Sequence, residues 1–378
     1  MDDRIKLLSV IGTRPEAIKM APVINEIKKH KNTIRSMVCV TAQHRELLDQ
    51  VLELFNIKPD FDLNIMMKNQ SPSSVASKIL KGMETIYKDN SFDWVLVHGD
   101  TTTAVAASIG AFYNGIKIAH VEAGLRTYNK WHPFPEEINR RMISVLTDLH
   151  FAPTAQAKQN LLDEGVGKSN IFVTGNSVID AVKWITKVPV EISKTSLRGI
   201  PWEKQIILVT VHRRENFGPP LDNIFKALIE LARKFQDSTC LVYPVHPNPN
   251  INKYAFDKLG KISNIILLPP LDYLHFAYLM NKSKLIITDS GGLQEEAPAL
   301  GKPVIVVRDV TERFEAIEAG TARLVGSNTK KIISEVSKLL TSAEEYKQMA
   351  RAVNPFGDGS TSKRIFELIA QHKKDKIN

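Results

Sequence analysis

Short apolar runs alternate with longer amphipathic segments along most of the chain. The apolar runs at residues 6–11, 36–41, 94–97 and 117–121 have the length and composition of buried strands. Between them, residues 17–29, 45–55 and 102–113 place apolar side chains at helical spacing. Strands that alternate with helices are typical of α/β proteins, in which each helix connects two parallel strands. The pattern therefore predicts a doubly wound parallel sheet.

The same pattern starts again after a polar loop at residues 187–204. Further strands are expected at 206–211, 240–245, 265–268, 285–288 and 304–307. We therefore predict two Rossmann-like domains facing across a cleft, residues 1–180 and 181–355. The turn-rich run from Asn354 to Gly359 breaks the chain again before an amphipathic segment at 362–372. Residues 356–378 are expected to form a C-terminal helix that packs back on the first domain.

Composition narrows the class of protein further. A chain of 378 residues with 43% hydrophobic residues can fill two cores. The net charge of +9 comes from scattered lysines and arginines without interleaved aromatic residues, so nucleic acid is not an expected partner, whereas an anionic substrate is. Cys39 and Cys240 each lie in an apolar strand, which argues against a disulfide. With no apolar run of about 18 residues and no signal peptide, we expect a cytoplasmic protein without a membrane partner.

Polar residues gather where the predicted strands end. Ligands of doubly wound proteins bind outside the carboxyl ends of the parallel strands, so these positions are candidates for an active-site cleft. A single such position is usually only a helix cap, but here the polar ends recur on one side of both sheets. They are Gly12–Glu16, Gln43–His44, His98–Thr101, Glu122–Thr127, His212–Asn216 and His246–Pro249.

The segment from residue 286 to 301 predicts an anion site. A strand ends at Thr288, and the amides of Ser290, Gly291 and Gly292 are expected to point into open space before the next helix. Glu296 lies one helical turn further on, where a carboxylate can accept hydrogen bonds from ribose hydroxyls. The alternative is a glycine turn followed by an acidic first helical turn, which suits the helix dipole.

Motifs for cofactors are absent from the sequence. No Gly-x-Gly-x-x-Gly follows the first strand, so a nicotinamide is not expected. Gly167-Lys-Ser169 lacks the earlier glycine of a phosphate loop, because Leu162 occupies that position. The ten histidines show no paired ligand spacing, so no metal is expected. We predict a reaction that needs no cofactor.

Six motifs follow one another over essentially the whole chain. They are Gly12-Thr-Arg-Pro-Glu-Ala-Ile-Lys19, His98-Gly-Asp-Thr-Thr102, His120-Val-Glu-Ala-Gly-Leu-Arg-Thr127, Pro135-Glu-Glu-Ile-Asn-Arg140, Thr210-Val-His-Arg-Arg-Glu-Asn216 and Asp289-Ser-Gly-Gly-Leu-Gln-Glu-Glu-Ala-Pro298. Together and in this order they resemble the non-hydrolysing UDP-N-acetylglucosamine 2-epimerases. The resemblance implies the two-domain fold of one large class of glycosyltransferases, with the sugar nucleotide held between the domains. Phe314 departs from the family pattern, which usually has proline there.

The resemblance also implies an activity: interconversion of UDP-N-acetylglucosamine and UDP-N-acetylmannosamine, which supplies N-acetylmannosamine units for cell-surface polysaccharide. Anti elimination of UDP gives 2-acetamidoglucal, and re-addition inverts C2. We assign proton transfer to Asp100 and Glu136 and orientation of the sugar or of Asp100 to Glu122. Glu136 could instead pair with Arg140 or Arg141 on its own helix.

The same resemblance implies a binding role for a larger group of residues. Arg14, Lys19, His212, Arg213 and the amides of residues 290–292 are expected to stabilise the departing UDP. Phe276 matches the position that stacks on uracil, although it also fits an apolar helix face. Besides the amides of Ser290, Gly291 and Gly292 and the side chains of Phe276 and Glu296, the group comprises Arg14, Lys19, Arg213, His246 and Arg313. His212 is assigned a catalytic role, in which it stabilises the charge that develops on UDP.

Gln43 and His44 match positions that hold a second UDP-N-acetylglucosamine as an activator, although His44 could simply cap the helix expected from residue 45. The family also implies a homodimer. Three other functions stay open from the sequence: a glycosyltransferase of the same fold, an epimerase for a UDP-diacetamido glucuronate, and a sensor that binds a nucleotide sugar without turnover.

Overall fold

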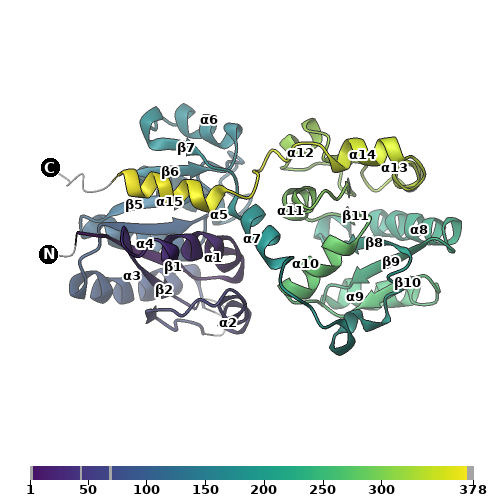
Figure 1. Cartoon of the computed structure of the whole chain (residues 1–378), viewed down its shortest axis with the longest axis horizontal. Helices are drawn as coiled ribbons and strands as arrows, with labels where there is room; N and C mark the ends of the chain where they lie inside the picture. Colours follow the sequence, from purple (N-terminus) through teal and green to yellow (C-terminus); the bar gives the residue numbers. More distant parts are fainter. Residues whose placement is uncertain (1–2, 43–44, 68–69, 373–378) are drawn as a thin grey trace. The chain divides into compact units, whose positions relative to one another are not determined.

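The computed structural model describes residues 3–42, 45–67 and 70–372, and the chain forms two units (Figure 1). Unit 1 combines Met1–Ala181 with Phe356–Asn378, and unit 2 comprises Val182–Pro355. The chain therefore passes between the units twice, after Ala181 and before Phe356.

Unit 1 is built on a seven-stranded parallel sheet in the order β3-β2-β1-β4-β5-β6-β7. The order reverses direction between β1 and β4, which is the position where doubly wound proteins bind ligands. The strands are β1 (Ile5–Ile11), β2 (Ile34–Val40), β3 (Phe61–Asp62), β4 (Trp94–His98), β5 (Lys117–Val121), β6 (Leu149–Ala152) and β7 (Ile171–Val173).

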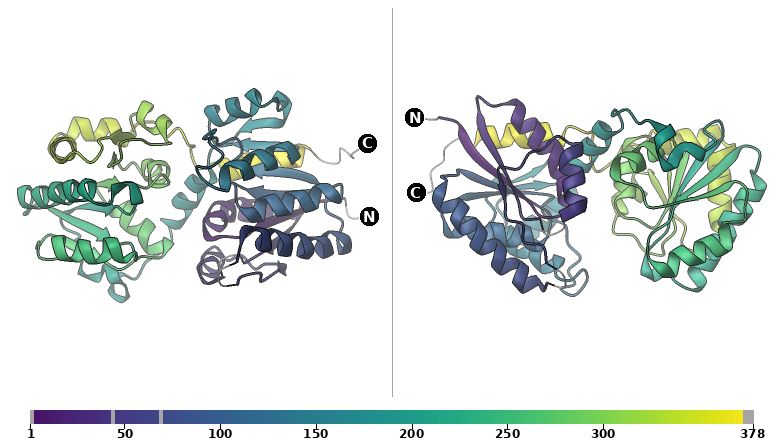
Figure 2. Two further views of the ribbon diagram at one scale, coloured as in Figure 1. Left: turned by 180° about the vertical axis from the view of Figure 1, so that it is seen from behind. Right: turned by 90° about the horizontal axis from the view of Figure 1, so that it is seen from below.

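Helices cover both faces of this sheet (Figure 2). The C-terminal helix α15 packs on α1 within unit 1, where the rings of His30 and Phe366 stack with centroids 3.8 Å apart. The helices are α1 (Arg14–Lys29), α2 (Arg45–Leu54), α3 (Pro72–Asp89), α4 (Thr102–Tyr113), α5 (Glu136–Leu146), α6 (Ala155–Asp163), α7 (Ser177–Ile185), which runs into unit 2, and α15 (Thr361–Gln371), with a 3₁₀ turn η1 (Lys168–Asn170).

Unit 2 repeats the architecture with six parallel strands in the order β10-β9-β8-β11-β12-β13. Its strands are β8 (Gln205–Thr210), β9 (Thr239–Pro244), β10 (Ile265–Leu268), β11 (Leu285–Thr288), β12 (Val304–Val306) and β13 (Ala322–Leu324). Its helices are α8 (Pro219–Lys234), α9 (Pro249–Leu259), α10 (Tyr273–Lys282), α11 (Leu293–Ala299), α12 (Phe314–Glu318), α13 (Thr329–Thr341) and α14 (Ala343–Ala350), with 3₁₀ turns η2 (Ile192–Lys194), η3 (Ser196–Gly199) and η4 (Arg214–Asn216).

The predicted α/β class with two Rossmann-like units is confirmed. Four strands were not predicted, namely β3, β6, β7 and β13, because each has only two to four residues and too little apolar sequence to show a period. Helix α1 begins at Arg14, three residues before the predicted start, since Thr13 and Glu16 form a capping box. Cys39 and Cys240 are buried and free. Among the described helices, none is long and apolar enough to cross a membrane.

Candidate active site

Glu122 lies directly after β5 in a backbone conformation with φ of 63°. A positive φ is uncommon for a residue with a side chain, and such residues cluster at functional sites. The Glu122 carboxylate forms an ion pair with Lys19 Nζ. Asn176 Nδ2 donates a hydrogen bond of 2.8 Å to Glu122 Oε2. Lys19 is therefore engaged with a carboxylate of unit 1.

His98, the last residue of β4, lies beside this carboxylate, with its Nε2 atom 3.9 Å from Glu122 Oε2. The ring is buried, and neither ring nitrogen has a hydrogen-bond partner among the described residues. Burial lowers the pKa of His98 to about 4, although Glu122 opposes the shift. His98 is therefore neutral near pH 7.

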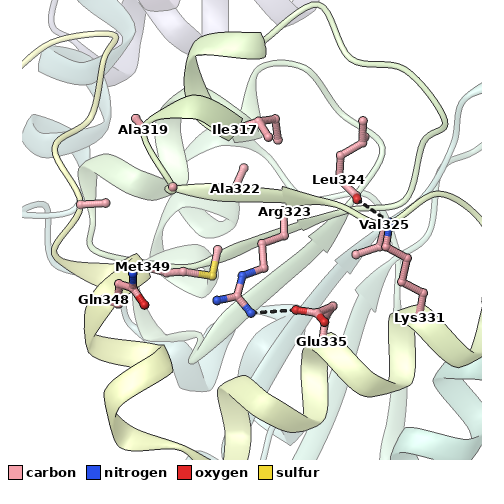
Figure 3. A pocket seen from close by; sticks show the side chains of 12 residues that line it. Ile317, Ala319, Ala322, Arg323, Leu324, Val325, Lys331, Glu335, Gln348 and Met349 are labelled. Atoms are coloured by element: carbon pink, nitrogen blue, oxygen red, sulfur yellow. Dashed lines mark hydrogen bonds and ion pairs between the residues drawn. The ribbon is translucent and has the colours of Figure 1, made fainter.

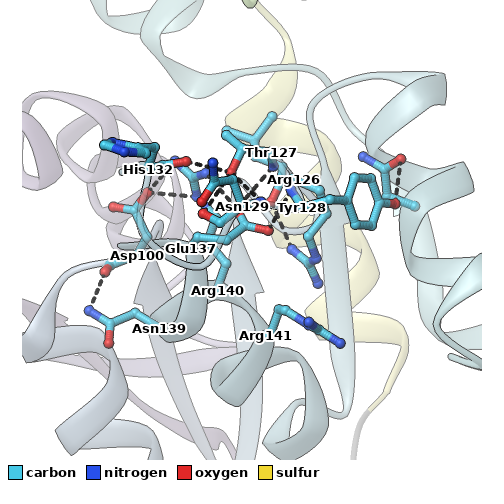
Figure 4. Close-up of polar contacts among 12 residues, drawn as sticks. Asp100, Arg126, Thr127, Tyr128, Asn129, His132, Glu137, Asn139, Arg140 and Arg141 are labelled. Atoms are coloured by element: carbon cyan, nitrogen blue, oxygen red, sulfur yellow. Dashed lines mark hydrogen bonds and ion pairs between the residues drawn. The ribbon is translucent and has the colours of Figure 1, made fainter. Parts of the chain in front are cut away.

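Asp100 follows β4 and is held by Arg140 of α5. The Arg140 Nε and Nη2 atoms lie 2.8 and 2.7 Å from Asp100 Oδ2 (Figure 4). Asn139 Nδ2 donates to the Asp100 backbone carbonyl at 2.8 Å. Burial raises the pKa of Asp100, Arg140 opposes this shift, and the nearby charge of Glu122 adds to it. Asp100 therefore holds a proton more readily than an exposed aspartate.

Glu137 connects this cluster to the loop after β5. Its two carboxylate oxygens accept the backbone N–H groups of Thr127 and Tyr128, each at 3.0 Å, and its Oε2 lies 3.2 Å from Arg140 Nη1 (Figure 4). The side chain is 1% exposed. Glu137 was not among the predicted site residues, because only the fold brings residue 127 next to α5.

The alternative that Glu136 pairs with an arginine of its own helix is wrong. Arg140 contacts Asp100 and Glu137, and Arg141 Nε lies 3.7 Å from Glu164. The Glu136 carboxylate has no hydrogen bond or ion pair with any other described residue. Glu136 and Arg140 have a spacing that permits a pair, but Arg140 is engaged by Asp100 and Glu137, and Arg141 by Glu164.

Asp100 and Glu136 line the same cavity of about 430 Å³ in unit 1. Thr13, Thr101 and Thr102 also line this cavity. A cavity of this size accommodates a small ligand. The structure thus brings together the two carboxylates to which proton transfer was assigned.

Glu16 holds together the two loops that carry Thr13 and Thr101. Its carboxylate accepts the N–H groups of Gly12 and Thr13 at 3.1 and 2.7 Å and the Thr101 hydroxyl at 2.7 Å. Burial raises the pKa of Glu16 to about 7 despite these hydrogen bonds. The residue therefore joins the loops after β1 and β4. The sequence did not identify this role, although the spacing Thr13-x-x-Glu16 is the signature of a capping box.

The predicted binding residue Arg14 occupies the first position of α1, where it is half-buried. Gln43 and His44, the predicted activator residues, lie outside the described part of the chain.

In unit 2, the buried Asp289 organises the loop after β8. Its Oδ2 atom accepts the backbone N–H groups of His212 and Arg213 at 2.9 and 2.8 Å and the Asn216 amide at 2.9 Å. Its Oδ1 atom lies 3.5 Å from His212 Nδ1. Burial lowers the pKa of His212, Asp289 opposes this, and His246 adds to it. The His212 and His246 rings stack with centroids 5.4 Å apart.

The glycine loop after β11 carries positive charge at its rim. A Cβ atom placed on Gly291 would lie 3.8 Å from Arg213 Nη2 and 3.9 Å from Arg313 Cζ. Two guanidinium groups therefore border this glycine, and guanidinium groups suit the recognition of phosphate oxygens. Arg313 Nε also forms an ion pair with the buried Glu295. No side chain at residue 291 separates the backbone from these two cations.

One part of the predicted anion site is wrong. The Ser290 N–H does not point into open space, because it donates to the Thr288 hydroxyl at 2.9 Å. A threonine at a strand end commonly captures the amide two residues on. Gly292 precedes α11, and a Cβ atom on it would lie 3.4 Å from Glu296 Oε1, so Glu296 is close to the loop. Phe276 is half-buried on α10.

A second cavity of about 470 Å³ lies in unit 2 beside the edge strand β13 (Figure 3). Arg323 on its wall is 2.7 Å from Glu335 and 2.5 Å from Glu345. The two carboxylates neutralise the arginine, and none of the predicted site residues lines this cavity. No group of three or more His, Cys, Asp or Glu side chains arranged to hold a metal occurs in the described ranges.

The fold and site define a doubly wound α/β protein with two carboxylate residues on one cavity, and comparison with known proteins defines the family. The UDP-N-acetylglucosamine 2-epimerase family profile matches residues 25–370. The chain is 51% identical over 374 residues to UDP-N-acetylglucosamine 2-epimerase of Neisseria meningitidis, covering 98% of this chain and all of that protein. The chain belongs to the UDP-N-acetylglucosamine 2-epimerase family, as the motifs predicted.

Solved structures agree with this assignment. The Neisseria meningitidis enzyme bound to UDP-GlcNAc superposes with a TM-score of 0.84 and 50% identity, covering 97% of this chain and all of that one. A glycosyltransferase from Rickettsia africae shares the fold at 15% identity, with a TM-score of 0.65 over 99% of this chain and all of the other. The predicted relation to the glycosyltransferase fold is therefore confirmed.

Proposed function

We propose that this protein interconverts UDP-N-acetylglucosamine and UDP-N-acetylmannosamine. The observation that carries the proposal is the pair of carboxylates, Asp100 and Glu136, on one cavity in a member of this family. Their surroundings differ, since Asp100 is bound by Arg140 while Glu136 has no ion pair with another described residue. Two carboxylates in different environments suit the separate acid and base roles of an epimerisation.

The reaction begins with loss of the diphosphate. The C2 proton has no adjacent carbonyl and is weakly acidic, but departure of the anomeric oxygen builds positive charge at C1 and acidifies it. One carboxylate takes the C2 proton, the C1–O bond breaks with its electrons on UDP, and a C1–C2 double bond forms. The other group starts as the protonated carboxylic acid and gives its proton to C2 from the opposite face, and the diphosphate oxygen adds back to C1. The two groups have then exchanged their protonation states. The reaction needs no cofactor, because substrate and product have the same composition.

Unit 2 supplies the groups that stabilise the departing UDP. We assign the diphosphate to Arg213, Arg313 and the amides of Gly291 and Gly292, because both guanidinium groups border this loop. A hydrogen-bond donor aimed at developing charge contributes about 2.7 to 4 kcal/mol to the transition state. We assign the ribose hydroxyls to Glu296, which lies beside Gly292.

Further residues are assigned to the uracil ring, the phosphate oxygens and the sugar. We assign the uracil ring to Phe276 and hydrogen bonds to phosphate oxygens to His212, His246 and Arg14. We propose that Glu122, whose carboxylate pairs with Lys19, orients the sugar or Asp100, and that Lys19 stabilises the charge that develops on UDP.

The proposal extends to a homodimer and to a site for an activator. We propose a cytoplasmic homodimer. Size-exclusion chromatography with light scattering tests the dimer, because it reports the mass of the assembly. We also propose that Gln43 and His44 hold a second UDP-N-acetylglucosamine as an activator. Pure UDP-N-acetylmannosamine should then react with a lag that traces of the gluco epimer remove and that is altered in His44→Ala.

The test of the activity is proton NMR of UDP-N-acetylglucosamine with the purified protein, in EDTA and without added nicotinamide. We expect the signals of the manno epimer to appear until equilibrium is reached. Asp100→Asn, Glu122→Gln and Glu136→Gln should each lower kcat by about 10²- to 10⁴-fold with little change in binding. Glu84→Gln, on the surface of α3, is the matched control and should react at the normal rate. A wild-type protein that forms no manno epimer would refute the proposal.

A further inference from the structure

The two segments of unit 1 next to the points where the chain leaves and re-enters this unit lie against each other. The Asp180 carboxylate accepts the N–H groups of Thr361 and Ser362 at 3.2 and 2.9 Å, at the start of α15. The Thr361 hydroxyl donates to the Thr174 carbonyl at 3.1 Å. Residues 174–180, just before the chain leaves unit 1, are therefore joined by hydrogen bonds to the start of α15, just after the chain re-enters it.

Gly175 allows the two backbones to approach closely. Its φ is 91°, a conformation that favours glycine. A Cβ atom there would lie 2.8 Å from Thr361 Oγ1 and 3.2 Å from the Phe356 carbonyl oxygen. A larger residue at 175 must displace the Thr361 hydroxyl and press on the backbone of the returning segment, residues 356–361.

Asn176 then connects this segment to the candidate active site. Its backbone N–H donates to the Phe356 carbonyl at 2.7 Å. Its Oδ1 atom accepts the Val178 N–H at 3.0 Å and so caps α7, while its Nδ2 atom donates to Glu122 Oε2 at 2.8 Å. The side chain is buried, with 3% of its surface exposed. One amide thus bonds both a helix end and the Glu122 carboxylate, and its own backbone is held by the returning segment.

We propose that Asn176 is a positioning residue for Glu122 and that the returning segment, residues 356–361, sets the orientation of this carboxylate through it. The inference rests on the proposed role of Glu122. Glu122 needs such support because its backbone is in the left-handed region, where a non-glycine residue is strained unless its surroundings hold it. Lys19 binds the same carboxylate oxygen, so the two donors together fix its direction.

Asn176→Asp separates the positioning role from the structural one. The aspartate oxygen can still accept the Val178 N–H, and a negative charge is favourable at a helix N-terminus, so α7 keeps its cap. The second oxygen replaces the donor and faces Glu122 with like charge. We expect a nearly unchanged Tm and a kcat lower by about 100-fold, the cost typical of a misplaced catalytic group, with a smaller change in KM.

The pH profile is the more specific readout. Loss of the Asn176 donor and addition of a like charge both disfavour the ionised form of Glu122. The acidic limb of the kcat profile should therefore move to higher pH in Asn176→Asp. Asn176→Ser, which keeps a short capping oxygen but cannot reach Glu122, should move it in the same direction by less. Gly175→Ala changes neither Glu122 nor Asn176. It should also shift the acidic limb, because the added methyl group displaces the Phe356 carbonyl that accepts the Asn176 N–H.

Asn264→Asp is the matched control in unit 2. The Asn264 amide is also buried, and it donates to the carbonyls of Ala232 and Thr239 at 2.9 and 3.3 Å. This substitution should lower Tm and leave the pH profile where it is. An Asn176→Asp or Asn176→Ser protein whose kcat and pH profile superimpose on those of the wild type would overturn the inference.

A second measurement keeps the inference independent of the proposed activity. Titration of ¹³Cδ-labelled glutamate, with the Glu122 signal assigned by its loss in Glu122→Gln, reports the pKa of this carboxyl directly. We expect a higher Glu122 pKa in Asn176→Asp than in the wild type. An unchanged pKa overturns the inference, whereas absence of epimerisation by the wild type refutes only the proposed function.

Discussion

Asp289→Asn should destabilise unit 2 and loosen its phosphate-binding loop while preserving the shape of the side chain. The Asp289 Oδ2 atom accepts three N–H donors, from the backbones of His212 and Arg213 and from Asn216. An asparagine oxygen can accept the same three donors but carries no charge. Hydrogen bonds to a charged group contribute about 1.5 to 3 kcal/mol each and neutral ones about 0.5 to 1.5, so the loss is about 1 kcal/mol per bond and about 3 kcal/mol in total.

Differential scanning calorimetry measures this loss. For a unit of this size, about 3 kcal/mol corresponds to a Tm lower by about 6 to 12 °C. Asp257→Asn, at an exposed position on α9, is the control and should change stability by less than about 0.5 kcal/mol. UDP affinity, measured by calorimetry, should also fall, because the Arg213 backbone is no longer held by a charge. A Tm and a UDP affinity equal to those of the control would refute the organising role of Asp289.

Two further predictions concern unit 1. Arg140→Gln removes the cation beside Asp100, so the Asp100 pKa should rise further and the acidic limb of the kcat profile should move to higher pH, which stopped assays over a pH series can measure. Burial lowers the pKa of His98, His120 and His150 to about 4, 3 and 4. Between the unfolded value of 6.5 and these values the unfolded chain binds more protons, so stability is lost as pH falls through this window, at up to about 1.4 kcal/mol per pH unit for each histidine. Urea unfolding of His150→Asn should therefore show a flatter pH dependence than the wild type, and equal slopes would contradict the assignment.

The sequence was sufficient to predict the architecture because parallel strands are buried on both faces and appear as continuous apolar runs. The strands β4 and β5 were predicted in this way, and their ends gave Asp100 and Glu122 as site candidates. The edge strands β7 and β13 were missed because they are short and only partly buried, whereas the equally short β12 is fully buried and lies in a continuous apolar run.

The partners of the site residues could not be predicted from the sequence. Asp100 and Arg140 are 40 residues apart, and Asn176 is 54 residues from Glu122, so only the fold brings them together. The sequence also gave no reason to prefer Glu137 as the carboxylate that pairs with Arg140. That choice depends on which face of α5 is buried, which the order of residues 136 and 137 does not determine.

The most direct test of the proposed epimerisation is NMR of UDP-N-acetylglucosamine and the wild-type protein in deuterated water. We expect both epimers to acquire deuterium at C2 as equilibrium is approached, because the C2 proton leaves to a carboxylate that exchanges with solvent. Formation of UDP-N-acetylmannosamine that keeps the original C2 hydrogen would contradict the elimination mechanism and the proton-transfer roles of Asp100 and Glu136.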